Sequence, residues 1–172
     1  MNADQARLLA DHYAGVFDQE GAITTKVLKA VPESGRDYRP DAKSRTAWEL
    51  ATHLATSDIW FLDSICDAAF GYDAETEKRM TAGFKTVGDV VEFYKREFPK
   101  RIQRLRETPA EKLAQEVDFF GMTMTPVAVL SFASNHSIHH RGQLAAYLRA
   151  AGSTVPSIYG GSADEPFTTA SA

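Results

Sequence analysis

The sequence is poor in cysteine: Cys66 is the single one among 172 residues. One cysteine excludes an internal disulfide and any zinc site that is built from several thiolates. A lone cysteine in an apolar helical segment is usually a small core residue, so we expect Cys66 to be buried and inert.

Long apolar runs and an excess of positive charge are also missing. No segment is apolar over the length that spans a membrane, and the N-terminus lacks the basic start and apolar stretch of a signal peptide. The net charge of −4 argues against a nucleic-acid partner, which usually needs a basic face. We therefore expect a cytoplasmic protein with no membrane and no nucleic-acid partner. The basic stretch over residues 95–106 is interspersed with glutamates, which is typical of a solvated helix face.

Apolar residues recur at helical spacing in four long segments, over residues 2–31, 44–70, 86–107 and 125–151. Capping patterns mark their starts at Thr46, Thr86 and Thr125. Gly71 is the expected stop of the second segment. Pro99 lies inside the third segment and should kink it or split it in two.

The connections between these segments carry weaker signals. Residues 72–85 are interpreted as a variable loop, and a short helical turn should start at Thr108 with Pro109 in its first position. Residues 117–122 should form an extended crossing or a short hairpin. The fold class is therefore all-α, a four-helix bundle that forms one domain over residues 1–160. Residues 161–172 are expected to form a flexible tail.

Three histidines are placed to meet inside this bundle. His136 and His140 are four residues apart, so they lie one turn apart on nearly the same face of a helix. His53 falls on the apolar stripe of the second segment. Three neutral imidazoles suit Zn, Ni, Cu or Fe and leave a coordination position open for water or substrate. The pattern favours one divalent metal ion over a metal-free, hydrogen-bonded histidine core, which stays open as the alternative.

Two further histidines leave choices open. His139 lies about 60° from His136 around the helix and could replace either neighbour as a ligand, or act in proton transfer. His12 falls on an apolar face of the first segment, where a hydrogen-bonded core histidine is favoured over a fourth ligand.

Other metal and nucleotide chemistries are excluded by missing residues. The zincin motif needs a glutamate directly after its first histidine, and Ser137 stands there. Paired Glu-x-x-His motifs for a di-iron site are missing from these helices, as are a P-loop and a dinucleotide fingerprint.

The run His-Ser-Ile-His-His-Arg-Gly-Gln-Leu over residues 136–144 resembles the DinB/YfiT-like family of metalloenzymes. Further matches are Tyr-Leu-Arg at 147–149, Val-Pro-Ser-Ile-Tyr-Gly at 155–160, Tyr-Arg-Pro at 38–40 and Trp-Glu-Leu-Ala-x-His at 48–53. Phe-Phe-Gly at 119–121 fits the same family's third-to-fourth connection, so the resemblance covers nearly the whole chain.

The resemblance implies an up-down-down-up bundle, often dimeric, with a metal ion bound by His53, His136 and His140. We expect Zn or Ni, with Mn or Fe as alternatives. Family members include transferases and isomerases that use thiols such as bacillithiol or mycothiol. The resemblance therefore implies a homodimeric enzyme that activates a low-molecular-weight thiol for S-transfer to an electrophilic small molecule. The alternatives are a metal-dependent hydrolase that uses bound water, and a non-catalytic, stress-related metal or ligand binder.

The neighbours of the expected ligands receive roles of their own. His139 is the candidate catalytic base, with Asp58 and Asp118 as further candidates for a hydrolase. Arg141 could bind a carboxylate of the substrate or thiol, although pairing with an acid across the bundle, such as Asp58 or Asp63, is favoured. Gln143 could contact the cofactor or orient a ligand histidine.

Overall fold

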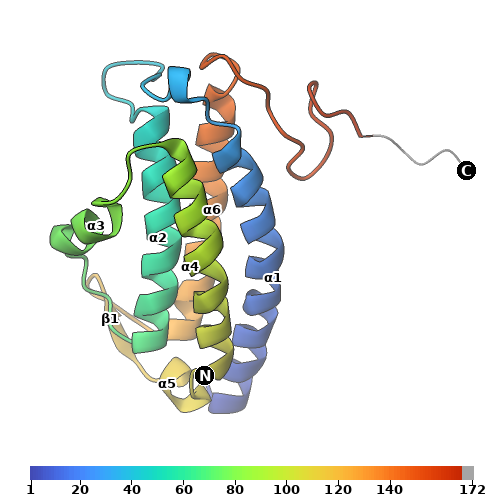
Figure 1. Cartoon of the computed structure of the whole chain (residues 1–172). Coiled ribbons are helices and arrows are strands. Elements are labelled where there is room, and N and C mark those ends of the chain that lie inside the picture. Colours follow the sequence, from blue (N-terminus) through green and yellow to red (C-terminus); the bar gives the residue numbers. More distant parts are fainter. Residues whose placement is uncertain (168–172) are drawn as a thin grey trace, which may run out of the picture.

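The structure, a computed structural model, describes residues 1–167 and is dominated by four long helices (Figure 1). They are α1 (Ala3–Lys29), α2 (Ala47–Asp67), α4 (Val87–Glu107) and α6 (Pro126–Tyr147). A short 3₁₀ helix, Glu33–Gly35, lies between α1 and α2. The four segments expected from helical periodicity are therefore confirmed.

The bundle has the up-down-down-up order that the family resemblance implied. The colours of Figure 1 show α1 and α6 running upward and α2 and α4 running downward. Helix α1 packs against α4 and α6, and α2 packs against the same two helices, so α1 and α2 lie diagonally across the core. The neighbours α2 and α6 carry the three histidines.

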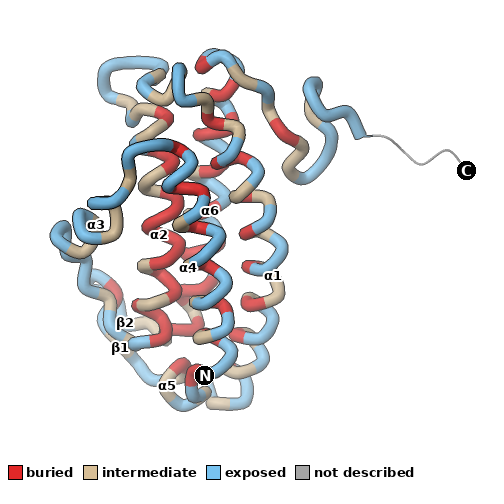
Figure 2. The backbone as a smooth tube through the Cα atoms, viewed as in Figure 1, coloured by how far each residue is buried: buried red, intermediate tan, exposed pale blue. Residues whose placement is uncertain are grey.

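The buried face of α1 is made of small residues. Ala6, Ala10 and Ala14 are fully buried at i, i+4 spacing, whereas Leu8 is 72% exposed. Figure 2 shows this alternation of buried and exposed turns along the helix. Because these alanines define the buried stripe of α1, His12 lies outside it and is exposed.

The helix starts predicted from the sequence agree with the structure more closely than the predicted helix ends do. Thr46 and Thr86 each form a capping box, in which the threonine hydroxyl accepts from the backbone N–H three residues later and the acid there accepts from the cap. Helix α2 ends at Asp67, and its C-cap, Ala68, adopts a left-handed conformation with φ of 56°. The predicted stop at Gly71 was therefore three residues late.

Pro99 does not split α4, which runs without a break from Val87 to Glu107. Its ring is exposed to solvent, and the buried residues on either side, Tyr94, Phe98 and Ile102, hold the helix against the core. Tertiary packing thus outweighs the cost of the lost hydrogen bond.

The connections contain more regular structure than was expected. Helix α3 (Ala74–Thr81) lies within the predicted loop, capped by Asp73. The strands β1 (Val117–Phe119) and β2 (Met122–Met124) pair antiparallel and confirm the short hairpin. Helix α5 (Ala110–Ala114) follows Pro109, which is the N-cap and not the first helical residue.

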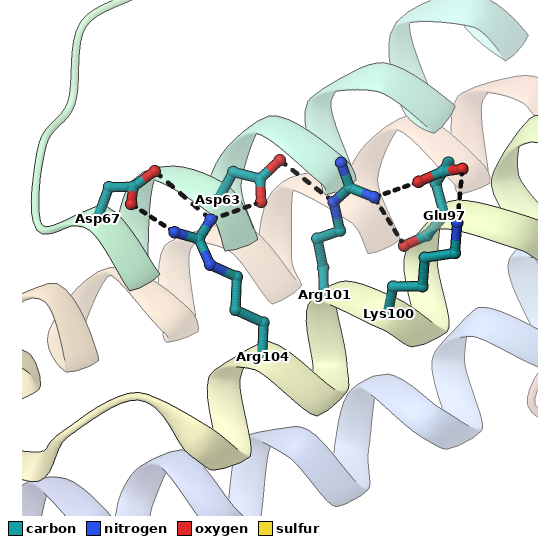
Figure 3. Close-up of polar contacts among 6 residues, drawn as sticks. All are labelled: Asp63, Asp67, Glu97, Lys100, Arg101 and Arg104. Atoms are coloured by element: carbon teal, nitrogen blue, oxygen red, sulfur yellow. Dashed lines mark hydrogen bonds and ion pairs between the residues drawn. The ribbon is translucent and has the colours of Figure 1, made fainter.

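Ion pairs join α2 to α4 on the outer face of the bundle (Figure 3). Arg104 binds Asp63 at 2.9 Å and also Asp67, and Arg101 binds Asp63 at 3.2 Å and Glu97. Part of the basic stretch therefore pairs with a neighbouring helix and is not only a solvated face.

The segment after α6 contacts α1, where the Tyr159 hydroxyl donates to Glu20 at 2.8 Å. Asp164 accepts hydrogen bonds from Val155 N at 2.8 Å and from Arg149 at 3.1 Å. Residues 168–172, part of the tail that was expected to be flexible, lie outside the described residues.

Among residues 1–167, no helix has the combined length and apolarity that a membrane crossing requires.

Candidate metal centre

His53, His136 and His140 meet between α2 and α6. One ring nitrogen of each lies within 4.8 Å of one ring nitrogen of the other two. The ring centroids are 5.2 Å apart for His53 and His136, 4.6 Å for His53 and His140, and 4.4 Å for His136 and His140. Helical spacing places His136 above His140, and the contact of α2 with α6 adds His53.

The three imidazoles are held in their neutral form. Burial lowers the pKa of His53 from 6.5 to about 3 and that of His136 to about 4. Burial also lowers the pKa of His140, and the positive charge of Arg45 acts on all three rings in the same direction. Neutral imidazole is the form that binds metal ions, so the ligand nitrogens need not lose a proton first at neutral pH.

The hydrogen bonds of the rings fit a metal site. Nδ1 of His136 is buried and has no hydrogen-bond partner among the described residues. His140 Nδ1 lies 2.8 Å from Oε1 of Gln143, which leaves Nε2 as the free nitrogen of that ring. An ion between the three rings would give their free nitrogens a partner, so the residues present fit the group that the sequence implied.

The other two histidines lie outside this cluster. His139 is exposed, and its ring meets that of His140 edge-on at 4.9 Å between centroids. His12 is exposed on α1, where its ring contacts Tyr13. The expectation that His12 is a buried core histidine was wrong. The catalytic role given to His139 stays a prediction.

Arg141 forms its ion pair with an acid other than the two named for it. Its side chain is 1% exposed and pairs with the carboxylate of Glu20 on α1. The guanidinium also donates to Thr24 Oγ1 at 3.0 Å, to the Glu20 carbonyl at 3.2 Å and to the Tyr159 hydroxyl. Arg141 does pair with an acid on another helix, as was favoured, but that acid is Glu20 and not Asp58 or Asp63. These contacts engage Nη1 and Nη2 of Arg141, and the cofactor-binding role given to this residue stays a prediction.

Asp58 and Asp118, considered as bases for a hydrolase, are engaged elsewhere. Asp58 is 5% exposed and accepts from the Tyr94 hydroxyl at 2.8 Å and from Ser137 Oγ at 3.1 Å. Asp118 lies in the hairpin and accepts from Gly121 N at 3.1 Å. The role of Tyr94 as a polar partner could not be predicted, because Tyr94 falls on the apolar face of its helix.

Burial raises the pKa of Asp58 from 3.8 to about 7, against the opposing effects of its hydrogen bonds and of Arg141. As pH rises above 4, the unfolded chain loses this proton before the folded chain does. Asp58 therefore stabilises the fold fully below pH 4, and that contribution is lost as pH rises towards 7. The relevant stability difference is the free energy of unfolding of the wild type minus that of Asp58→Asn. We expect this difference to fall between pH 4 and pH 7.5, by on the order of 1.4 kcal/mol for each unit by which the folded and unfolded pKa values of Asp58 differ.

Urea unfolding of both proteins across this pH range, in the presence of a chelator, checks the prediction. Asp63→Asn serves as control, because Asp63 is a half-exposed, ion-paired carboxylate on the same helix. A wild-type minus Asp58→Asn difference that does not change with pH would contradict the assignment of a neutral Asp58.

A cluster of aromatic side chains lies beside His136, and the sequence pattern did not predict it. The Phe61 ring lies 5.1 Å from that of His136 and 5.6 Å from that of Phe132. Trp60 contacts Phe61 at 4.7 Å, Tyr72 at 6.0 Å and Phe120 at 6.2 Å. Their signal in the sequence was the density of aromatics in α2 and the hairpin, but only the fold brings these segments together.

A four-helix bundle with three converging, neutral histidines on neighbouring helices defines a class of helical protein with a potential metal site. The chain belongs to the DinB family, whose model matches residues 1–168.

Relatives and solved structures agree with this assignment. Protein YrdA of Bacillus subtilis is 27% identical over 156 residues, which is 90% of each chain. Protein YjoA of the same organism is 28% identical over 144 residues, covering 80% of this chain and 87% of YjoA. The crystal structure of YjoA, a DinB-like protein, superposes with a TM-score of 0.66 at 25% identity over 83% of this chain and 93% of that one. A DinB-like protein from Bacillus cereus gives a TM-score of 0.68 at 23% identity over 87% and 97% of the two chains, a likeness of fold.

Proposed function

We propose that this chain holds one divalent metal ion at His53, His136 and His140 and activates a low-molecular-weight thiol for S-transfer to an electrophilic substrate. The observation that carries the proposal is the convergence of three neutral imidazoles within 4.8 Å. Three protein ligands leave at least one position for an outside ligand, which is the pattern of catalytic rather than structural sites. Zn and Ni fit the all-nitrogen donor set best, with Mn and Fe as alternatives.

The surroundings of the site favour a thiol over water as that ligand. Bound to a divalent ion, a thiol would be fully deprotonated, whereas the pKa of bound water would fall only to about 7. Within residues 1–167, no carboxylate hydrogen-bonds to the three rings, and Asp58 and Asp118 have other partners. A thiol therefore needs less help from the protein than a water nucleophile does.

The chain's own residues would position the reactants. Gln143 fixes the ring of His140, and the aromatic side chains around Trp60 and Phe61 limit the access of water. His139 lies at the exposed edge of the cluster, where it could receive a proton that the thiol gives up.

The proposal is tested with protein that has been stripped of metal and reloaded with Zn, Ni, Mn or Fe. An electrophile panel is assayed with bacillithiol, mycothiol, glutathione or no thiol, for the wild type and for His53→Ala. We expect product that requires both metal and thiol, and at least a 100-fold loss in His53→Ala. If no thiol changes the rate with any metal, S-transfer is wrong. If product forms with metal but without thiol, and this activity is lost in His53→Ala, the protein is a hydrolase instead.

A further inference from the structure

A small pocket opens beside His53, between the outer face of α2 and helix α3. Its main walls come from His53, Thr56, Ser57, Trp60, Tyr72 and Met80, and it encloses about 30 Å³. Trp60 lies seven residues after His53, so both side chains share one face of α2. The pocket thus begins at a proposed metal ligand and ends at an indole ring.

The inner surface of this pocket is almost entirely apolar. Thr56 and Ser57 donate their hydroxyl protons to backbone carbonyls of their own helix, at 2.9 and 2.6 Å. Of the acids on α3, Glu77 accepts from the Tyr72 hydroxyl, and Asp73 caps the helix at Glu75 N. The hydroxyls of Thr56 and Ser57 are therefore engaged by their own helix, and a mostly apolar surface faces the pocket, which disfavours a charged substituent.

The indole of Trp60 is held in a fixed orientation. Its Nε1 donates to the carbonyl of Gly71 at 3.1 Å, and its ring meets that of Tyr72 edge-on at 6.0 Å between centroids. Two aromatic rings and the thioether of Met80 form a surface that packs well against a flat ring.

We propose that this pocket binds a flat, uncharged aromatic group of a ligand whose head group reaches the metal ion at the three histidines. The inference rests on the proposed metal centre and adds a substrate class to it: an aryl compound that carries its reactive or metal-binding atom next to the ring. The helical rise of about 10 Å over seven residues is long enough for a ring that is joined directly to such a head group to lie beside Trp60.

Helix α3 must move outward when such a group binds. The enclosed 30 Å³ has room for one or two water molecules, whereas a cavity that takes benzene measures roughly 150 Å³. No residue of α3 is buried, and the exposed Gly71 and Gly83 flank the segment on either side. Opening the pocket therefore disrupts none of the core and mainly releases the contacts of Tyr72 and Met80.

The test compares two hydroxamates that chelate divalent ions through the same head group. Acetohydroxamate carries a methyl group and benzohydroxamate carries a phenyl ring. Calorimetric titration of the Zn-loaded and Ni-loaded protein should give a dissociation constant at least 10-fold lower for benzohydroxamate. In a Trp48→Phe background, where Trp60 is the remaining tryptophan, benzohydroxamate should change the fluorescence and acetohydroxamate should leave it nearly unchanged.

Two matched methionine variants locate the ring. Met80→Lys places a charge in the pocket and should raise the dissociation constant of benzohydroxamate to that of acetohydroxamate, without changing the latter. Met122→Lys makes the same change in the hairpin, at a side chain that is 53% exposed and outside the pocket, and should alter neither constant. Unchanged acetohydroxamate binding in Met80→Lys also shows that the variant is folded.

The failures of the two proposals give different results. Equal affinity for both hydroxamates in the wild type would overturn the aryl pocket and leave the metal centre standing. The aryl pocket would also be wrong if Met122→Lys weakened benzohydroxamate binding as much as Met80→Lys does. If neither hydroxamate binds the metal-loaded protein, the open coordination position is wrong, and the proposed function fails with it.

Discussion

Replacing Arg141 with methionine should lower the free energy of unfolding by about 3 to 5 kcal/mol, a large share of the stability of a single domain. The substitution removes a fully buried charge and leaves the carboxylate of Glu20, 16% exposed, without its cationic partner. It also leaves the buried hydroxyl of Thr24 without a donor, while Tyr159 keeps its own hydrogen bond to Glu20. Urea unfolding followed by circular dichroism, with chelator present, measures the loss.

Arg104→Met is the matched control for this prediction. Arg104 also binds two carboxylates, but its side chain is 43% exposed, so its loss should cost less than about 1 kcal/mol. The double variant Arg141→Met/Glu20→Leu should recover part of the stability, because it removes the stranded charge. If Arg141→Met is as mild as Arg104→Met, the account of Arg141 as the buried tie between α6 and α1 is wrong.

Replacing His136 or His140 with alanine should weaken binding of Zn by more than about 100-fold. The loss of an outer-shell partner typically costs 10 to 100-fold in affinity, and removal of a ligand costs at least as much. Gln143→Leu should therefore be intermediate, at about 10-fold, because it only frees the ring of His140. Competition titration with a chromophoric chelator measures the three constants.

His139→Ala is the matched control on the same helix. Its ring is exposed and touches His140, but it lies outside the triad, so the affinity and the one-to-one stoichiometry should be kept. A loss in His139→Ala equal to that in His140→Ala would mean that the ligand set is wrong.

The bundle could be predicted because its signals are local. Neighbouring residues in the sequence form the capping boxes at Thr46 and Thr86, and they also set the helical spacing of the apolar residues. The centre followed from His136 and His140 at one-turn spacing, together with the family resemblance, which chose among alternatives that spacing left open. The homodimer, the cytoplasmic location and the division of the chain at residue 160 stay predictions.

The features that could not be predicted depend on contacts between segments that are distant in the sequence. Helix α3 has too few apolar residues to show a periodic stripe, and its place over α2 comes from Tyr72 and Trp60. The sequence analysis favoured pairing of Arg141 with an acid across the bundle, but only the packing of α1 against α6 selects Glu20. The pairing of Asp58 with Tyr94 likewise joins residues from different helices.

A crystal structure of the metal-loaded protein, with anomalous data on both sides of the absorption edge, tests the central claim most directly. The account predicts one ion per chain with nitrogens of His53, His136 and His140 at about 2.0 to 2.1 Å and at least one position filled by solvent or an added ligand. An ion at another place, or one that His139 ligates in place of His140, would contradict it.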